Sequence, residues 1–353
     1  MIARAATLAL LLTILAPLAG HPAEAGAQVV TLRMAVNVPT NSPWDLGLQR
    51  LAAEFSRVSE GKVRLEFPPS AHIATESDII QKMRLGLDGA LLSTYGLAEL
   101  YPDSLALSMP DYIGNDKEFD AVLAAVKPLI ESKLEDRYVV LALSKGGWVR
   151  YFSKTPIVYP SDLVDTRISI ESGNDKEDLF MQGLGARVVP GSISDFLLQI
   201  NSNAVDATCQ SPIFIAALWS QLRGKIAYMS AFKVAPFIGA VVFNKSSWDR
   251  VPPELRPRLR QVVADMAERT GLDSARLEED AIASLDGIKI PPEPDEAAAK
   301  WAEVSARWRN GPIAQMFSAD ILAAMDAALA GLRHSKPGPD ARVSSRQADR
   351  AMP

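Results

Sequence analysis

Residues 29–67 carry a strand–helix–strand pattern, and this pattern restricts the possible folds more than any other stretch of the chain. The segments "VVTLRMAVN" and "KVRLEF" alternate between apolar and polar residues, as half-buried strands do. Between them, Ser42, Pro43 and Asp45 occupy the N-cap, first and third positions of a predicted helix, and Gly61 follows its end. Two strands joined through one helix run parallel, so the pattern predicts an α/β domain.

Strands and helices keep alternating after residue 67, in two blocks that a proline-containing segment separates. The first block ends in "YVVLALSKGG" and "WVRYFSK", "PIVYPSDL" interrupts the pattern, and a second block starts at "RISIES". One more strand, a long helix over residues 252–288 and two final helices follow. We predict an α/β protein of two lobes, with lobe I at 28–151, lobe II at 152–235, and a return strand to lobe I, a long connecting helix and C-terminal helices at 236–334.

Both ends of the chain are predicted to lie outside the lobes. Residues 1–27 combine a basic start, an apolar run and small residues before Ala25 and Ala27, which is typical of a cleaved secretory signal peptide and predicts a periplasmic protein. The apolar run is shorter than the roughly twenty residues of a membrane span. Residues 335–353 are polar without an apolar period, which predicts a disordered tail. No later segment is apolar enough to span a bilayer, so we expect no membrane span in the mature chain.

Composition and motifs favour a globular protein and give no support for an enzyme. The chain has 353 residues, 48% of them apolar, and a formal charge of -5, which favours globular domains over disorder or nucleic-acid binding. Cys209 is the single cysteine, so no intrachain disulfide forms. The three histidines, of which His72 alone lies in the predicted lobes, have no nucleophile motif beside them. Phosphate-loop, dinucleotide and metal spacings are absent from the sequence, so we predict no cofactor, no metal site and no enzymatic activity.

Several motifs in order resemble one family. The segments "TLRMAVNVPTNSPW", "LGLDGALLSTYGLAELYPDSLALSMPDYI", "GLGARVVPGSISDFLLQINSNAVDATCQSP" and "VVFNKSSWDRVPPELR" resemble the periplasmic solute receptors of TRAP transporters, of the dicarboxylate-receptor type. The resemblance extends to about residue 330. It implies a two-lobed receptor that closes on a small molecule and delivers it to the membrane permease subunits.

The resemblance also shows where this chain departs from the family. Members hold an organic acid with an arginine in a "GLKIRVP"-like stretch, because a guanidinium makes two parallel hydrogen bonds to a carboxylate. Aligned from the preceding "DL", that arginine becomes Ser169, and Arg167 falls on the lysine before it. A second arginine position becomes Val149, and Gln210 stands in the altered "DGxEN"-like turn. Burying a carboxylate without a cation costs several kcal/mol, so we expect an apolar ligand or an organic acid with apolar character.

Two alternatives remain for the charged residues near this strand. Arg167, Ser169 and Glu171 share one face, so Arg167 either anchors an anionic ligand or forms a structural pair with Glu171. In the turn that follows, residues 172–174 with Asn174 either cap the next helix or offer donors to a ligand.

The segment "GWVRYFSK" leaves a similar choice. Trp148 and Arg150 share one face of a strand, which either lines a cleft or belongs to a half-buried edge strand. The segment resembles an arginine-poor branch of the family, which implies less polar ligands and, in some bacteria, a TPR-containing periplasmic partner. Aromatic residues at Trp148, Tyr95, Phe237 and Trp44 then either line the cleft or belong to the core.

These patterns together predict a periplasmic solute receptor that serves a TRAP transporter. The alternative is a ligand-binding sensor or carrier that works with a non-permease partner such as a TPR lipoprotein. The candidate ligand-binding residues are Tyr95, Trp148, Arg150, Arg167, Ser169, Glu171, Asn174, Gln210 and Phe237.

Overall fold

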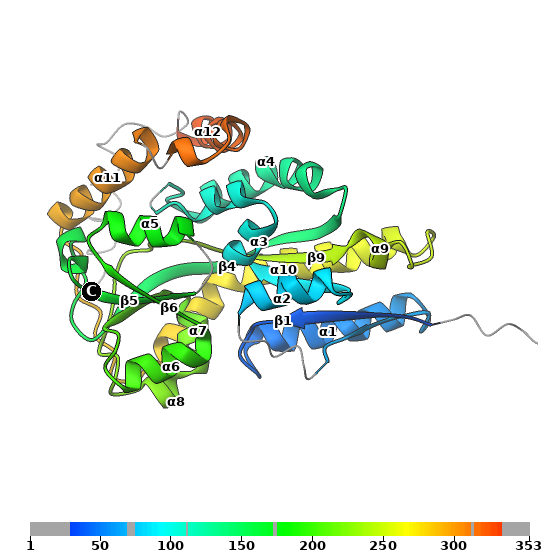
Figure 1. Cartoon of the computed structure of the whole chain (residues 1–353), viewed down its shortest axis with the longest axis horizontal. Helices are drawn as coiled ribbons and strands as arrows, with labels where there is room; N and C mark the ends of the chain where they lie inside the picture. Colours follow the sequence, from blue (N-terminus) through cyan, green and yellow to red (C-terminus); the bar gives the residue numbers. More distant parts are fainter. Residues whose placement is uncertain (1–28, 69–74, 111, 172–174, 312–313, 334–353) are drawn as a thin grey trace, which may run out of the picture.

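The computed structural model of the chain describes residues 29–68, 75–110, 112–171, 175–311 and 314–333 (Figure 1). The predicted signal peptide, the predicted tail, His72 and Asn174 lie outside the described residues. Among those described, no helix is long and apolar enough to cross a membrane.

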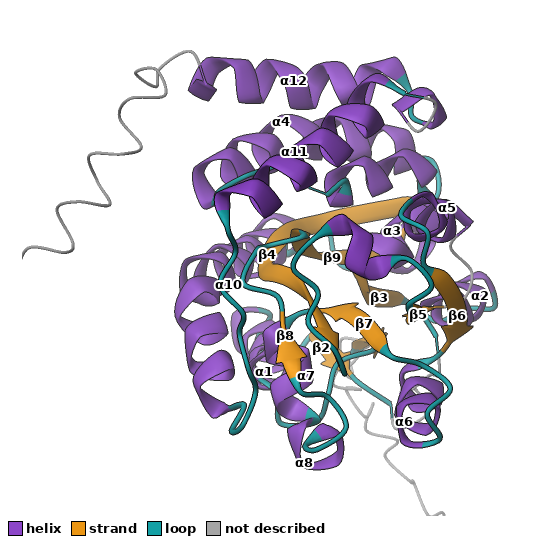
Figure 2. Ribbon diagram, turned by 90° about the vertical axis from the view of Figure 1, so that its left-hand side faces the viewer, coloured by secondary structure: helices purple, strands orange, loops and turns teal. Residues whose placement is uncertain are grey.

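Nine strands in the described part of the chain form one mixed sheet, in the order β2-β1-β3-β9-β4-β7-β5-β6, with β8 paired to β4 (Figure 2). The strands are β1 Val30–Val36, β2 Val63–Glu66, β3 Gly89–Ser93, β4 Tyr138–Ser153, β5 Arg167–Glu171, β6 Arg187–Gly191, β7 Ala207–Gln210, β8 Tyr228–Met229 and β9 Ala235–Asn244.

Helices cover both faces of this sheet. They are α1 Pro43–Val58, α2 Glu76–Arg84, α3 Thr94–Leu100, α4 Asp116–Leu134, α5 Asp175–Gly183, α6 Ile193–Asn201, α7 Pro212–Ala217, α8 Trp219–Leu222, α9 Lys245–Trp248, α10 Arg256–Ser284, α11 Asp295–Asn310 and α12 Ala319–Arg333. Short 3₁₀ helices are η2 Pro102–Ser108, η3 Pro160–Leu163 and η4 Ala314–Met316. The fold is the predicted α/β class, with the long helix and C-terminal helices in place.

The opening β1-α1-β2 unit forms as its sequence predicts. β1 and β2 pair in parallel, with Val30 opposite Val63. The Ser42 side chain accepts a hydrogen bond from the Asp45 backbone N–H at 3.3 Å, and Pro43 is the first helical residue. Gly61 has a φ of 78°, a conformation that glycine adopts without the steric cost of a Cβ. The unit is therefore set by local capping and turn chemistry.

Strand β4 connects the two halves of the sheet. Its first part pairs antiparallel with β9, and its last four residues, Arg150–Ser153, pair with β7. Sixteen residues of strand span about 50 Å, enough to cross both lobes. The register with β9 shifts between Lys145 and Gly147, where the strand bulges. β4 runs across the predicted boundary between residues 151 and 152, which itself stays a prediction.

Three clusters of buried apolar side chains hold helices against the sheet. On one face of the β1-β3 half, α1 and α10 pack through residues such as Leu51, Phe55 and Val263. On the other face, the cluster includes α2, α3, α4 and α12. In the β5-β7 half, α6, α7 and α8 pack on the end of β4 at Phe152. Both sheet faces are thereby covered, as expected for an α/β fold (Figure 1).

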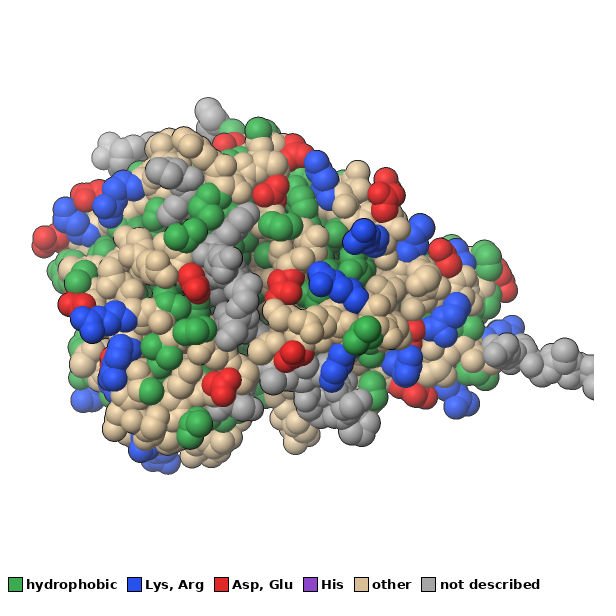
Figure 3. All heavy atoms as spheres, viewed as in Figure 1, with side chains coloured by type: hydrophobic (Ala, Val, Ile, Leu, Met, Phe, Trp, Pro, Cys, Tyr) green, Lys and Arg blue, Asp and Glu red, His purple; other side chains and the backbone are tan. Residues whose placement is uncertain are grey.

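Helices α10, α11 and α12 reach across the molecule. α10, about 43 Å long at 1.5 Å per residue, contacts α1 in one half and α7 in the other. α11 packs near η3, and α12 packs on α4. On the face shown in Figure 3, Lys and Arg side chains alternate with Asp and Glu. That face has no single-sign patch of the kind that attracts a polyanion.

We expect the β3–β9 contact at Gly89 to tolerate no side chain. A Cβ built there lies 2.5 Å from Phe243 Cδ1 and 2.8 Å from the Val242 carbonyl oxygen, whereas a Cβ at Gly47 in α1 has nothing within 4 Å. Gly89→Ala should lower the free energy of unfolding by about 2 kcal/mol through overpacking. Gly47→Ala should raise it by about 0.5 kcal/mol through helix propensity. Urea unfolding measures both, and equal midpoints for the two variants would contradict the packing described.

Candidate functional site

A cavity of about 580 Å³ lies between α1 and α10, over the end of β3, the middle of β4 and the first half of β9. Its volume is in the range of small-molecule sites. The apolar side chains that line it include Trp44, Leu48, Leu51, Phe237, Met266 and Leu277. The lining residues come from 37–93, 144–146, 237–239 and 262–277, and among the residues that the structure describes none comes from the β5-β7 half of the sheet.

Two aromatic rings mark one side of this cavity. The Trp44 and Phe237 ring centroids are 5.4 Å apart, with an interplanar angle of 45°. Trp44, on the first turn of α1, also packs against the apolar cluster of the β5-β7 half. Phe237 fits because residue 146 is glycine, since a Cβ there would lie 2.5 Å from Phe237 Cδ1. The glycine at position 146 of β4 thus leaves room for the Phe237 ring beside the cavity.

A buried carboxylate, Glu76, also lines the cavity. It accepts hydrogen bonds from the backbone N–H groups of Ser93 at 2.6 Å and Gly96 at 2.9 Å. Burial raises the pKa of Glu76, against the opposing effect of the hydrogen bonds from Ser93 and Gly96. The carboxylate is held by the protein and adds an acidic group, not a cation, to the cavity wall.

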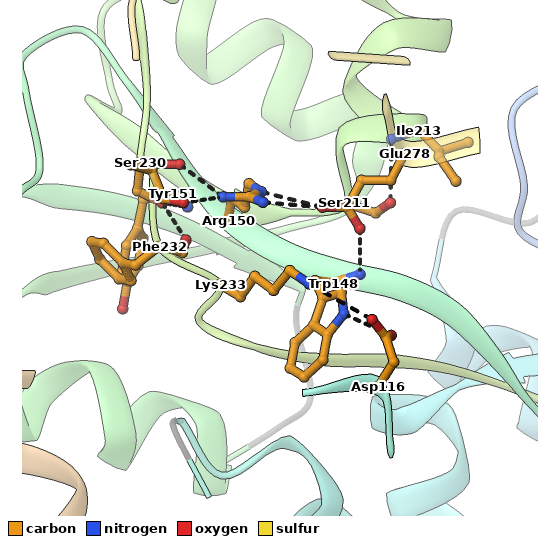
Figure 4. A network of polar contacts seen from close by, with 11 residues as sticks. Asp116, Trp148, Arg150, Tyr151, Ser211, Ile213, Ser230, Phe232, Lys233 and Glu278 are labelled. Atoms are coloured by element: carbon orange, nitrogen blue, oxygen red, sulfur yellow. Dashed lines mark hydrogen bonds and ion pairs between the residues drawn. The ribbon is translucent and has the colours of Figure 1, made fainter. Parts of the chain in front are cut away.

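Trp148 and Arg150 lie outside the lining of this cavity, in a polar network that joins β4 to α10 (Figure 4). Trp148 is 3% exposed, and its indole N–H donates to Asp116 Oδ1 at 3.2 Å. The Arg150 guanidinium donates to Glu278 Oε1 at 3.3 Å and to the carbonyl oxygens of Ser230 and Ala231. The structure thus places both residues in internal contacts, and a role in ligand binding stays a prediction.

Glu278 is the centre of this network. Its side chain is 7% exposed, and it also accepts the Trp148 backbone N–H at 3.1 Å. A Cβ on Gly147, whose φ is 102°, would lie 3.1 Å from Glu278 Oε2. Burial raises the pKa of Glu278, and attraction from Arg150 acts in the opposite direction. The carboxylate therefore connects α10 to the bulged part of β4.

Arg167 forms a structural ion pair, with a partner that the sequence did not indicate. Its Nε and Nη2 atoms donate to the two carboxylate oxygens of Asp206, each at 2.7 Å. These hydrogen bonds lower the pKa of Asp206. Arg167 starts β5, about 13 Å along the strand from its last residue, Glu171. The structure thus shows a structural pair with Asp206, and because the Glu171 side chain lies outside the described part of the structure, a pairing with Glu171 stays a prediction.

The other predicted residues are dispersed. Ser169, at the position of the family arginine, is 4% exposed and donates from Oγ to Gln199 Oε1 at 3.0 Å. Gln210 lies opposite Arg150 in the β4–β7 ladder. Tyr95 packs at the edge of the cluster that contains α2, α3 and α4. Of the nine candidate ligand-binding residues, Phe237 is among the described residues that line the cavity, and Trp44, the fourth aromatic residue considered for the cleft, lines it too.

The sequence patterns did not predict that α10 forms a wall of the cavity. Val262 and Met266 continue the apolar stripe of α10 and are expected in the core on that pattern. Both are partly buried against the core cluster of α1 and α10, and both also line the cavity. An apolar stripe too wide to be covered completely by the sheet is a weak signal of a cavity. Helical periodicity shows which residues share a face, but not what that face contacts.

Comparison with known proteins agrees with this architecture. The family model described as bacterial extracellular solute-binding protein, family 7, matches residues 34–310. The C4-dicarboxylate-binding periplasmic protein DctP of Rhodobacter capsulatus is 23% identical over 318 residues, which are 86% of this chain and 92% of that protein.

Solved structures share the fold at low sequence identity. A TRAP periplasmic solute-binding protein from Sulfurospirillum deleyianum with bound succinate superposes with a TM-score of 0.76 at 18% identity, covering 86% of this chain and 99% of that one. The sugar acid binding protein of Advenella mimigardefordensis in complex with galactonate gives a TM-score of 0.77 at 19% identity, covering 85% and 98%.

We expect Glu278→Gln to lower the free energy of unfolding by about 3 kcal/mol, because it leaves the Arg150 guanidinium buried without a counter-charge. Glu279→Gln, on the exposed neighbour in α10, is the matched control and should change stability little. The double variant Arg150→Met with Glu278→Leu should recover most of the loss. Chemical denaturation of the wild type and the three variants measures the free energy of unfolding. A Glu278→Gln variant as stable as the control would contradict a stabilising role of the Arg150–Glu278 pair.

Proposed function

The chain belongs to the bacterial extracellular solute-binding proteins of family 7, the TRAP receptor family that its motifs resemble, and on this premise we propose that it captures an organic acid with a large apolar part. The observation that carries the proposal is the cavity between α1 and α10, whose lining includes Trp44, Phe237 and Met266. We propose that this cavity holds the apolar part of the ligand.

The residues at the two family arginine positions support this choice. Ser169 and Val149 are both buried, and neither has a charge to offer a carboxylate. Binding energy must then come from apolar contact. Burial of about six methylene groups contributes roughly 5 kcal/mol at 0.8 kcal/mol each, enough to bind without an arginine at either of these positions.

The relatives give the chemical class of the ligand. One binds C4-dicarboxylates by name, and the solved structures hold succinate and galactonate, all of them carboxylic acids. We infer that the ligand of this chain is also a carboxylic acid. We propose that its remaining part is apolar, unlike the compact polar bodies of those ligands. An apolar molecule without a carboxylate is the limiting case of the same proposal.

We propose that the receptor works by closure of the two lobes. β4 and α10 reach both halves of the molecule, so small rotations in these two elements would change the distance between lobe I (28–151) and lobe II (152–235). Trp44 contacts the cluster of the second half and the aromatic ring of Phe237. A ligand beside Trp44 would therefore affect the contact between Trp44 and the second half, and closure would change the same contact.

The proposal includes the location of the protein and its transport partner. Cleavage of residues 1–27 would release the protein to the periplasm, where it binds without turnover and delivers its ligand to the TRAP permease subunits.

The arginine-poor segment "GWVRYFSK" favours one second candidate, a ligand-binding sensor or carrier that works with a TPR lipoprotein. Genes for TRAP membrane subunits beside this one would support transport, and a TPR lipoprotein gene in their place would support the second candidate.

We expect octanoate and 4-phenylbutanoate to raise the melting temperature more than succinate does, because their apolar parts fill the cavity. Phe237→Ala should weaken octanoate binding by about 10-fold or more through lost apolar contact. Tyr95→Ala is the matched control, since Tyr95 is also half-buried but does not line the cavity. Calorimetric titration measures the affinities. Binding of succinate alone, or equal losses in the two variants, would contradict the proposal.

A further inference from the structure

The rim of the cavity carries charged residues from both walls. Arg50 and Glu54 stand on α1, and Asp265, Arg269, Asp273 and Arg276 stand on α10. Arg50 and Arg269 are both exposed, and they border the cavity from opposite helices. The lining therefore includes exposed guanidinium groups from both helices.

The acidic groups on this rim have partners of their own. Glu54 forms an ion pair with Arg57 at 2.7 Å, and Asp265 accepts a hydrogen bond from Gln261 at 2.7 Å. Asp273 pairs with Arg276 at 3.4 Å, and Arg276 also pairs with Asp280 at the same distance.

The two remaining cations are different. Arg50 and Arg269 form no hydrogen bond or ion pair with any residue that the structure describes, although Arg269 is attracted by Glu54 from a distance. They are the rim groups whose donors stay available to an anion.

The inner wall of the cavity carries an acidic side chain and not a cation. Glu76 is buried there and already accepts hydrogen bonds from Ser93 and Gly96. A ligand carboxylate beside it would meet a second acidic group with no cation to separate them. An acid that enters this cavity is therefore best oriented with its apolar part inward and its carboxylate at the rim.

We propose that Arg50 and Arg269 receive the carboxylate of an amphipathic monocarboxylate whose apolar part fills the cavity, in place of an arginine on β5. This inference rests on the proposed function and assigns the orientation of the ligand. Guanidinium groups suit the task because each offers a planar pair of donors to a carboxylate. A dicarboxylate is disfavoured, because its second carboxylate would lie among apolar residues or beside Glu76.

Calorimetric titration with octanoate and its uncharged analogue octanamide tests this assignment. The double variant Arg50→Gln/Arg269→Gln should bind octanoate about 10-fold more weakly and octanamide unchanged, because the amide carries no charge. Arg64→Gln/Arg258→Gln removes the same charge from exposed residues on β2 and α10 that do not line the cavity. This control should keep the wild-type affinity for both ligands. Raising NaCl to about 0.5 M should weaken octanoate binding to the wild type and to this control, but not to the Arg50→Gln/Arg269→Gln variant.

Each remaining result is decisive. Wild-type affinity for octanoate in the Arg50→Gln/Arg269→Gln variant would overturn the rim assignment and leave the proposed function standing, because octanoate still binds. Equal losses for octanoate and octanamide would also overturn it, since a charge-specific contact cannot affect an amide equally. Failure of the wild-type protein to bind either molecule would overturn both this inference and the proposed function.

Discussion

The antiparallel pairing of β4 with β9 on one side and with β7 on the other is the contact on which the rest of the molecule depends. It makes one sheet of two α/β halves, and it brings the bulge at Lys145–Gly147 to the point where they meet. The buried Arg150–Glu278 pair then connects α10 to β4 just beyond that bulge. Because removing one member of a buried pair is costly, this connection constrains how α10 lies over the sheet.

The position of α10 determines what the protein can bind. α10 and α1 form opposite walls of the cavity, and Gly146 allows Phe237 to cross beneath them. The two arginines nearest to the family positions are held in ion pairs: Arg150 pairs with Glu278, and Arg167 pairs with Asp206. What remains for a ligand is apolar surface inside and exposed guanidinium groups at the rim. This division of polar and apolar groups matches a molecule with one charged end.

Local signals predicted most of the fold, and non-local contacts account for what they missed. The Ser42 cap, the helix of residues 43–58 and the long α10 follow from capping and periodicity, which a few neighbouring residues determine. The Arg167–Asp206 pair joins residues 39 apart, and strand parity on β5 alone pointed to Glu171. Trp148 and Phe237 look alike in sequence, yet one is enclosed by Phe119 and Asp116 and the other faces the cavity. Such differences depend on which helix covers each strand.

We propose that the ligand lies between α1 and α10, with apolar contact in place of a β5 arginine. A crystal structure of the protein with octanoate would show the position of the ligand. We expect electron density for the alkyl chain against Phe237 and Met266, with the carboxylate toward the rim. Density at the carboxyl ends of β5 and β7, beside Ser169 and Gln210, would contradict it.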